Sequence, residues 1–466
     1  MKEELEAGTS GMQAMAGDPK KAILKLGLPM MFAMSIQTVY NLVDTFWVSG
    51  LGSDALAAVG FVFPFFFASI AISTGLGVGG GSAISRRLGA KDKQGADNVA
   101  VHTMIIMLIL SLLFAVPLFL FAESIFISIG AGSTADMATS YGKIIFAGTF
   151  FIFFPNVANA ILRSEGDTKR AMNAMILGSV LNIILDPILI YVLDMGIAGA
   201  AWATVISLAV TAVLMFNWLF FRKDTYISFD FKDFSFDRGI LKDIFRVGFP
   251  ASVQQSSMAL MMLVMNMILI TVSDTDGVAV YTVGWRVATI AIAPLMGIST
   301  AVVTMSGFAY GEGSYSKLSS SHLYATKISF LVETAIAALT FILAPQIAYV
   351  FTMSESASHI TGDLVIFIRI ICLFYPMVSL GMLSSSLFQG IGKGVNALIA
   401  TILRAVILVP LFAALFAIYF GHGLVGIWWG IVVGNVLGSL VIFIWARLHV
   451  GALLRKESGF TAAEPV

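Results

Sequence analysis

The sequence predicts an all-α integral membrane protein with twelve transmembrane helices in two six-helix lobes, and three observations support this. Of the 466 residues, 58% are hydrophobic and only 12% are charged, too few polar side chains to cover a water-soluble surface. Apolar runs recur from residue 22 to residue 447, and each is long enough to cross a hydrocarbon layer about 30 Å thick as a helix. One long polar break divides the runs into two sets of six.

The predicted spans lie near residues 22–48, 55–80, 98–122, 139–162, 170–193, 197–221, 243–270, 277–306, 323–347, 361–388, 394–420 and 424–449. The chain is accordingly divided into a tail at 1–21, an N-terminal lobe at 22–221, a linker at 222–242, a C-terminal lobe at 243–449 and a tail at 450–466. The first tail is polar and lacks an apolar core, so we expect a flexible segment rather than a cleavable signal peptide.

Basic residues predict the orientation. Arg86 and Arg87 follow the second span and Arg163 follows the fourth, whereas the opposite loops carry acids such as Asp136 and Asp194. Short cytoplasmic loops retain Lys and Arg. We therefore expect a multi-pass protein of the cell (cytoplasmic) membrane with both termini in the cytoplasm.

The two halves resemble each other. Gly27-Leu28-Pro29 recurs as Gly248-Phe249-Pro250, a shift of 221 residues, and later matches show slightly larger shifts. Six spans in each repeat make both halves enter the membrane from the same side, which predicts a pseudo-two-fold axis along the membrane normal with a cleft between the lobes. Chance similarity is the alternative, because Gly and Pro are common in membrane helices.

Two carboxylates in the first half are the main functional candidates, because an acid within a membrane helix is costly and normally faces a cavity or a partner. Asp44 lies late in the first span and Asp186 late in the fifth, both about 10 Å from the predicted outer end, and Thr204 falls at similar depth in the sixth. Together with Asn182, one turn before Asp186, they could bind a hard cation such as Na⁺, or the carboxylates could hold a proton between them. Mutual support within the helix bundle is the structural alternative.

Further polar residues accompany the two acids. On the first helix, Gln37, Tyr40 and Asn41 share a stripe with Asp44, and Ser179 shares one with Asp186. We interpret them as substrate-binding or supporting residues. Two prolines, Pro29 and Pro187, are the predicted hinges; the missing N–H of Pro187 frees the carbonyl of Ile183.

The second half inherits neither acid. At the repeat shifts, Asp44 corresponds to Met265 or Asn266 and Asp186 to Val409, so we expect one coupling site per chain, confined to the first lobe. Other charges within the second-half spans are Arg286, Glu333, Arg369 and Arg404. Glu333 could form a buried pair with one of these arginines, and we interpret the four charges as structural.

Several classes of protein are disfavoured. No serine, histidine and carboxylate set indicates hydrolysis, no Walker sequence indicates ATP use, and the five histidines have no metal-ligand spacing, so we expect neither an enzyme nor a cofactor beyond the coupling ion. The formal net charge is zero, which gives no reason to expect a nucleic-acid partner. The single cysteine, Cys372, excludes an internal disulfide.

Several motifs together resemble the multidrug and toxic compound extrusion (MATE) family. They are Leu26-Gly27-Leu28-Pro29, Tyr40-Asn41-Leu42-Val43-Asp44, Ala83-Ile84-Ser85-Arg86-Arg87-Leu88-Gly89, Arg163-Ser164-Glu165-Gly166-Asp167-Thr168, Asn182-Ile183-Ile184-Leu185-Asp186-Pro187 and Phe388-Gln389-Gly390-Ile391-Gly392-Lys393. Because the motifs occur in both halves, the resemblance covers essentially the whole chain.

The resemblance implies a secondary active antiporter that exports cationic or amphipathic organic compounds in exchange for H⁺ or Na⁺. It is closest to the DNA-damage-inducible-type (DinF-like) branch, particularly its archaeal members, whose first-lobe cation site matches Asp44, Asn182, Asp186 and Thr204, with Asn159 at a neighbouring polar position. Other branches use an acid in the seventh helix, where this chain has Gln254, Gln255 and Ser256. The implied partners are small organic substrates and membrane lipid, with no obligatory protein partner. The rival interpretation is a lipid or lipid-linked oligosaccharide flippase of the same superfamily.

Overall fold

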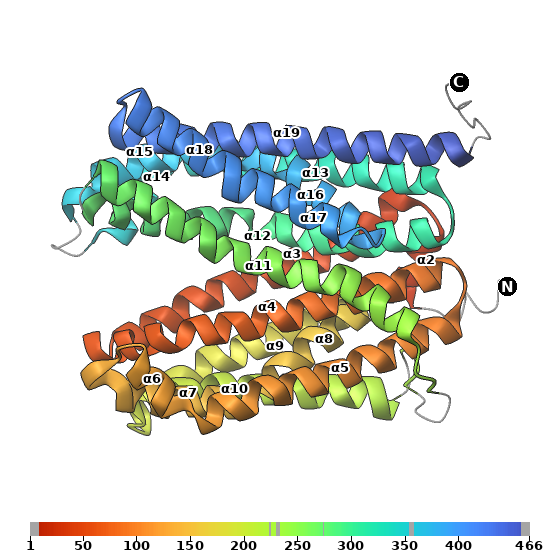
Figure 1. Ribbon diagram of the computed structural model, residues 1–466, viewed down its shortest axis with the longest axis horizontal. Coiled ribbons are helices and arrows are strands. Elements are labelled where there is room, and N and C mark those ends of the chain that lie inside the picture. Colours follow the sequence, from red (N-terminus) through yellow and green to blue (C-terminus); the bar gives the residue numbers. More distant parts are fainter. Residues whose placement is uncertain (1–8, 223–224, 230–233, 274, 354–357, 458–466) are drawn as a thin grey trace. The chain divides into compact units, whose positions relative to one another are not determined.

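The computed structural model describes residues 9–222, 225–229, 234–273, 275–353 and 358–457, and within these ranges every regular element is a helix (Figure 1). Parts of the predicted tails, 1–21 and 450–466, and of the predicted linker, 222–242, lie outside the described residues. In the described part, the helices are long and apolar, because Leu, Ile, Val, Phe and Ala fill the spans and backbone groups in lipid must be satisfied within the helix. The all-α prediction is confirmed.

Two compact units make up the chain. Unit 1 comprises Met1–Ala16 and Phe32–Ser252, and unit 2 comprises Gly17–Met31 and Val253–Val466. The unit boundary falls inside two long helices, α3 (Pro19–Ser49) and α11 (Arg238–Val272), each the first span of its half. The predicted lobes at 22–221 and 243–449 differ from these units in residues 22–31 and 243–252, whose packing partners could not be read from hydropathy.

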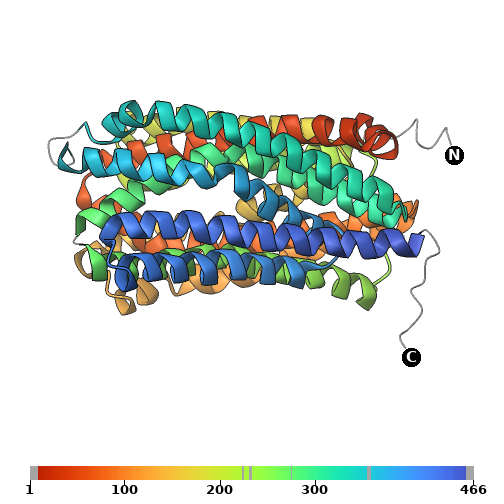
Figure 2. The same cartoon turned by 90° about the horizontal axis from the view of Figure 1, so that it is seen from above.

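Unit 1 contains the second part of α3 and the first part of α11, and its other helices are α2 (Ser10–Ala16), α4 (Ser53–Gly89), α5 (Lys93–Leu120), α6 (Ala122–Ser128), η1 (Gly132–Thr134), α7 (Ala135–Ala147), α8 (Thr149–Ser164), α9 (Thr168–Pro187), η2 (Ile188–Val192), α10 (Gly196–Phe216) and η3 (Asn217–Arg222). In unit 2 the other helices are α12 (Thr275–Gly311), α13 (Tyr315–Ile342), α14 (Ala344–Phe351), η4 (Ser358–Ile360), α15 (Thr361–Ile371), η5 (Cys372–Phe374), α16 (Tyr375–Gly390), α17 (Gly394–Thr401), η6 (Ile402–Leu408), α18 (Val409–Ala414), η7 (Leu415–Tyr419) and α19 (Gly423–Glu457). Within each unit the long helices run side by side in both views, as α13 and α19 do (Figures 1 and 2).

The described residues contain eleven single helices that are long and apolar enough to cross a membrane, or twelve spans if one bent pair is counted. The pair consists of Gly132–Ala147 and Thr149–Ser164, which meet at an angle of 44° around Gly148. This pair corresponds to the predicted fourth span at 139–162, which is therefore broken rather than straight. With the bent pair included, the structure agrees with the predicted twelve.

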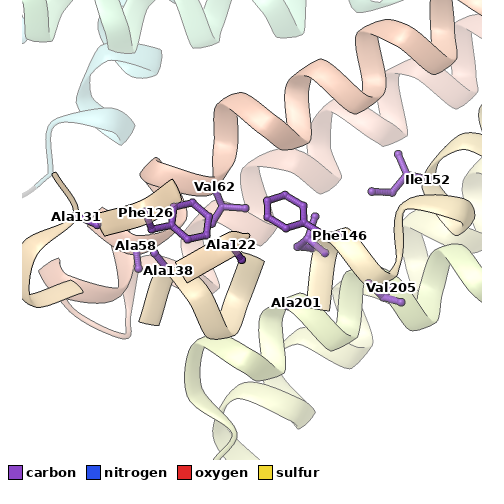
Figure 3. Packing of buried hydrophobic residues seen from close by; sticks show 11 residues of the cluster. Ala58, Val62, Ala122, Phe126, Ala131, Ala138, Phe146, Ile152, Ala201 and Val205 are labelled. Carbon is purple, nitrogen blue, oxygen red and sulfur yellow. The ribbon is translucent and has the colours of Figure 1, made fainter. Parts of the chain in front are cut away.

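The apolar core of unit 1 is built where α4, α6, α7, α8 and α10 meet (Figure 3). Phe126 and Phe146 lie at its centre and stack with ring centroids 6.3 Å apart, and the ring of Phe65 meets both edge-on. Gly142 permits this arrangement, because a Cβ there would lie 2.8 Å from the Phe126 ring. The core fixes the broken α7–α8 pair against α4 and against α10, which carries Thr204.

The expected flexible tail is wrong for residues 9–16. Thr9 begins α2 by accepting a hydrogen bond from the Met12 N–H, and its hydroxyl donates to the carbonyl of Glu165 at 2.7 Å. Met12 and Met15 are buried. Gly11 packs against the backbone of Gly166, where a side chain on either residue would overlap the other. A hydropathy analysis does not detect this anchor, because it has only two buried apolar side chains, Met12 and Met15, beside the Thr9 hydrogen bonds and the Gly11 contact.

Candidate cation site in unit 1

The carboxyl groups of Asp44 and Asp186 face each other from α3 and α9, close enough for a hydrogen bond between them. Asp186 is fully buried and Asp44 is partly exposed. In the described part of the chain, no Lys, Arg or His pairs with either group, and one oxygen of Asp186, Oδ1, has no hydrogen-bond partner. Two adjacent carboxylates in a dry environment are unfavourable unless a proton or a cation neutralises them.

Asn182 and Thr204 complete one side of the cluster. With its amide nitrogen facing Asp186, Asn182 donates to Asp186 Oδ2 at 2.9 Å and its amide oxygen accepts from the Thr204 N–H at 3.2 Å. The Thr204 hydroxyl donates to the carbonyl of Ala200 at 3.1 Å. Because α9 and α10 pack along their length, these bonds fix the Asp186 carboxyl relative to α10.

Two tyrosines border the carboxyl pair. The Tyr40 hydroxyl, one turn before Asp44 on α3, lies within hydrogen-bond reach of Thr204. Tyr141 of α7 is close enough to both carboxyls to interact with them electrostatically. We did not predict Tyr141 from the sequence. At the predicted bounds Tyr141 lies only two residues, about 3 Å, inside the fourth span, which is shallower than Thr204, so the depth argument passed it over.

Pro187 ends α9 directly after Asp186, and a π-helix, η2, follows. Proline cannot donate a hydrogen bond to the Ile183 carbonyl, and beyond it the chain continues in a wider turn in which the N–H of Leu193 donates to the carbonyl of Ile188 at 2.9 Å, five residues back. The predicted irregularity at Pro187 is present. Its role as a hinge stays a prediction, as does that of Pro29 within α3.

The remaining candidates lie outside this cluster. Gln37 and Asn41 have exposed side chains on α3, and Ser179 is buried one turn before Asn182 without joining the described hydrogen bonds of the cluster. Asn159 donates to the carbonyl of Ala171 at 3.0 Å. Ala171 is eleven residues before Asn182 on α9, about 16 Å along the helix axis. The structure therefore groups Asp44, Asp186, Asn182, Thr204 and Tyr40, and separates Asn159 from them.

The donor set is made of carboxylate, amide and hydroxyl oxygens, which suit a hard monovalent cation, and the partnerless Asp186 Oδ1 offers one ligand position. The same atom could instead carry or accept a proton shared with Asp44. Among the described residues, no group of three or more His, Cys, Asp or Glu side chains could hold a metal ion. The cluster therefore fits Na⁺ or H⁺ better than a transition metal.

The buried pair considered for Glu333 and an arginine does not form among the described residues. Both carboxyl oxygens of Glu333, on α13, are buried without a hydrogen-bond partner among the described residues. Arg404 instead donates to Asn435 Oδ1 at 3.0 Å, and Arg369 lies over the ring of Phe341 at 5.5 Å. Where other branches of the resembling family have an acid, Gln254 accepts from Gln389 at 2.7 Å and donates to Thr401.

Comparison with known proteins points to one family. The MatE family model matches residues 29–188 and 250–414. Multidrug export protein MepA of Staphylococcus haemolyticus (strain JCSC1435) is 29% identical over 448 residues, covering 94% of this chain and 96% of that protein. MepA of Staphylococcus saprophyticus is 27% identical over 453 residues, with coverage of 95% and 96%.

Solved structures agree with this match. An outward-facing multidrug resistance MATE family transporter of the MOP superfamily has a TM-score of 0.94 and 48% identity, covering 96% of this chain and 99% of that one. A MOP superfamily transporter from Pyrococcus furiosus Vc1 has a TM-score of 0.92 and 49% identity with the same coverage, and is described as having a binding pocket of reverse polarity that suggests a different function.

Proposed function

The chain belongs to the MATE family of multidrug efflux transporters, and from this premise we propose that it is a secondary active antiporter that exports cationic or amphipathic organic compounds in exchange for H⁺ or Na⁺. It carries out this exchange as a single chain in the cell membrane, with both termini in the cytoplasm. Small organic substrates and membrane lipid are its partners, and it needs no obligatory protein partner.

One observation carries the proposal: Asp44 and Asp186 meet in a buried cluster without any basic partner among the described residues. Neutralising the pair with a cation or a proton removes a repulsion in a medium where charges interact strongly. Entry of that ion down its gradient therefore supplies free energy for a rearrangement of unit 1. When Na⁺ is the ion, it draws the two carboxylates together; when H⁺ is the ion, it bridges them.

Coupling requires that ion binding favour one state of the transporter and substrate binding the other. Asp44 lies on α3, whose first part belongs to unit 2 and whose second part belongs to unit 1. A change in how Asp44 meets Asp186 alters the position of the second part of α3, and this shift lowers the affinity for substrate on the outer side. Alternating access then follows from movement of the two repeats.

The lipid-flippase alternative is not favoured. That alternative required Arg286, Arg369 and Arg404 to form a cationic cavity. Arg404 is instead hydrogen-bonded to Asn435, and Arg369 lies over the Phe341 ring. The matched relatives from Staphylococcus are multidrug export proteins. The assignment to the DinF-like branch is part of the proposal, supported by the first-lobe residues and by Gln254 in place of an acid.

The test measures drug efflux from proteoliposomes under separately imposed Na⁺ and pH gradients. Asp186→Asn and Asp44→Asn are compared with the wild type and with Asp194→Asn, an exposed position with positive φ that asparagine tolerates. We expect the first two variants to stay folded and lose gradient-driven efflux, while the control retains it. Undiminished efflux by Asp186→Asn would refute the mechanism, and the gradient that drives the wild type identifies the ion.

A further inference from the structure

A second contact joins the two segments that carry the carboxyl pair. The hydroxyl of Tyr191, on the π-helix η2, donates to the main-chain carbonyl of Trp47, on α3, at 2.6 Å. The two rings meet edge-on with centroids 6.1 Å apart. Trp47 is three residues after Asp44 and Tyr191 is five residues after Asp186, so this contact lies about one helical turn beyond the carboxyl pair on both segments. We call it the Tyr191–Trp47 latch.

The π-helix explains why Tyr191 reaches α3 at all. Five residues of α-helix would turn Tyr191 about 140° away from Asp186. The wider π turn, with its hydrogen bond from the Leu193 N–H to the Ile188 carbonyl, brings residue 191 back toward the face on which Asp186 lies. The π turn after Pro187 thus directs two consecutive polar groups, the Asp186 carboxyl and the Tyr191 hydroxyl, to the same neighbouring helix.

Gly50 leaves the space that the latch needs. A Cβ at this position would overlap the Tyr191 hydroxyl oxygen, whereas its next neighbours, the Trp47 carbonyl oxygen and Tyr191 Cζ, would lie at 3.4 and 3.5 Å, close to ordinary contact distances. The obstruction is therefore specific to the hydroxyl group. Removing that oxygen would make room for an alanine.

Apolar packing supports the same junction. Val48, next to Trp47, is buried against Ile190, next to Tyr191, and against Ala200 of α10, with Tyr141 packed on the cluster. Ala200 also provides the carbonyl that accepts from Thr204. The packing beside the latch and the cation cluster therefore share α3 and α10, and η2 continues directly from α9, which carries Asp186.

We propose that Tyr191 is a positioning residue for ion coupling: by holding the Trp47 carbonyl, it fixes the end of α3 so that Asp44 stays opposite Asp186. The inference rests on the proposed function and extends it to a residue that does not touch the ion. Without the latch, α3 has to be ordered when the ion binds, and ion affinity falls. Movement of α3 away from η2 during transport has to break this bond first.

The experiment measures the concentration of the driving ion that gives half-maximal efflux, together with the maximal rate and the melting temperature of the full-length protein. Loss of one hydrogen bond of this kind in Tyr191→Phe raises the half-maximal ion concentration about threefold to tenfold. The maximal rate and melting temperature stay near wild type. Tyr419→Phe is the matched control, an exposed tyrosine at the end of a second π-helix, η7, in unit 2.

Gly50→Ala gives an independent route to the same defect, because its Cβ displaces the Tyr191 hydroxyl. The double variant Gly50→Ala with Tyr191→Phe contains no clashing oxygen, so it should behave like Tyr191→Phe alone rather than worse. A purely structural role predicts lower melting temperatures with an unchanged half-maximal ion concentration. That result, or additive effects in the double variant, would overturn the proposal.

The two proposals fail in different ways. Efflux that survives in Asp186→Asn defeats the proposed coupling site whatever Tyr191→Phe does. Loss of efflux in Asp186→Asn, together with an unshifted half-maximal ion concentration in Tyr191→Phe, defeats the latch alone.

Discussion

Glu165 connects three segments at one end of unit 1, and its protonation should control how firmly they are held. It follows α8, its side chain is fully buried, its Oε2 accepts from the Ile227 N–H at 2.8 Å, and its carbonyl accepts from Thr9. Burial raises the pKa of Glu165 from 4.5 to about 8, with a smaller contribution from Asp167. The carboxyl group is therefore largely neutral in the folded protein at pH 7.

Because the pKa of Glu165 is raised, the state in which residues 9–16 and 225–229 pack around its carboxyl binds a proton more tightly than the state in which they have opened. The contribution to stability is fully present below about pH 4.5 and is lost as pH rises toward 8. A difference between 4.5 and about 8 corresponds to a total on the order of 5 kcal/mol. We therefore expect residues 9–16 and 225–229 to open more often as the pH is raised from 6 to 9.

Hydrogen–deuterium exchange of the full-length protein in lipid nanodiscs measures this opening, after correction for the intrinsic pH dependence of exchange. In Glu165→Gln, the side chain is neutral at every pH and its oxygen can still accept from Ile227, so protection of both segments should become independent of pH. Glu123→Gln, at an exposed carboxyl, is the control. Equal pH dependence in Glu165→Gln and the wild type would refute the reasoning.

Two further predictions concern burial. Glu333→Gln should keep or raise the melting temperature, because glutamine preserves the shape of a buried carboxyl that has no described partner. Glu333→Lys should lower the melting temperature strongly, because it buries an unpaired charge. A large drop in the melting temperature of Glu333→Gln would indicate an ion bound at this position. Gly430→Ala should destabilise unit 2 by about 1–3 kcal/mol, because its Cβ would overlap the backbone of Ala413. Gly60→Ala, with open space around it, should instead be neutral or stabilise α4 by up to about 1 kcal/mol, and thermal melting in detergent compares the two.

The fold class was predictable because lipid imposes helices of a minimum length, which hydropathy reveals directly. The grouping of Asp44, Asp186 and Thr204 was also predictable, since helical rise and span direction give the depth of each residue. Tyr141 was missed because the fourth span was predicted to begin at residue 139, whereas the bent pair begins at Gly132, which places Tyr141 deeper than the prediction did. Depth alone does not say which way a helix is rotated.

Rotation about the helix axis explains the errors in unit 2. The cost of burying a charge suggested that Glu333 would find an arginine. The close approach of α19 to Arg404, where a Cβ at Gly438 would lie 2.7 Å from Arg404 Cγ, directs the guanidinium to Asn435 instead. Such contacts depend on which small residues face each other, and hydropathy averages over them. The anchored segment from Thr9 to Ala16 escaped detection for a related reason, because two buried methionines make no periodic pattern.

The division of α3 and α11 between the units has a consequence for how the protein could be taken apart. Helix α3 passes from unit 2 to unit 1 after Met31, and α11 passes from unit 1 to unit 2 after Ser252. These two positions are 221 residues apart, the same offset that relates Gly27-Leu28-Pro29 to Gly248-Phe249-Pro250. Each half thus donates the opening turns of its leading helix to the packing of the other. A chain divided at its centre gives two fragments, each of which lacks a segment of its own unit. We therefore expect split chains to assemble when they are co-expressed rather than when they are produced separately.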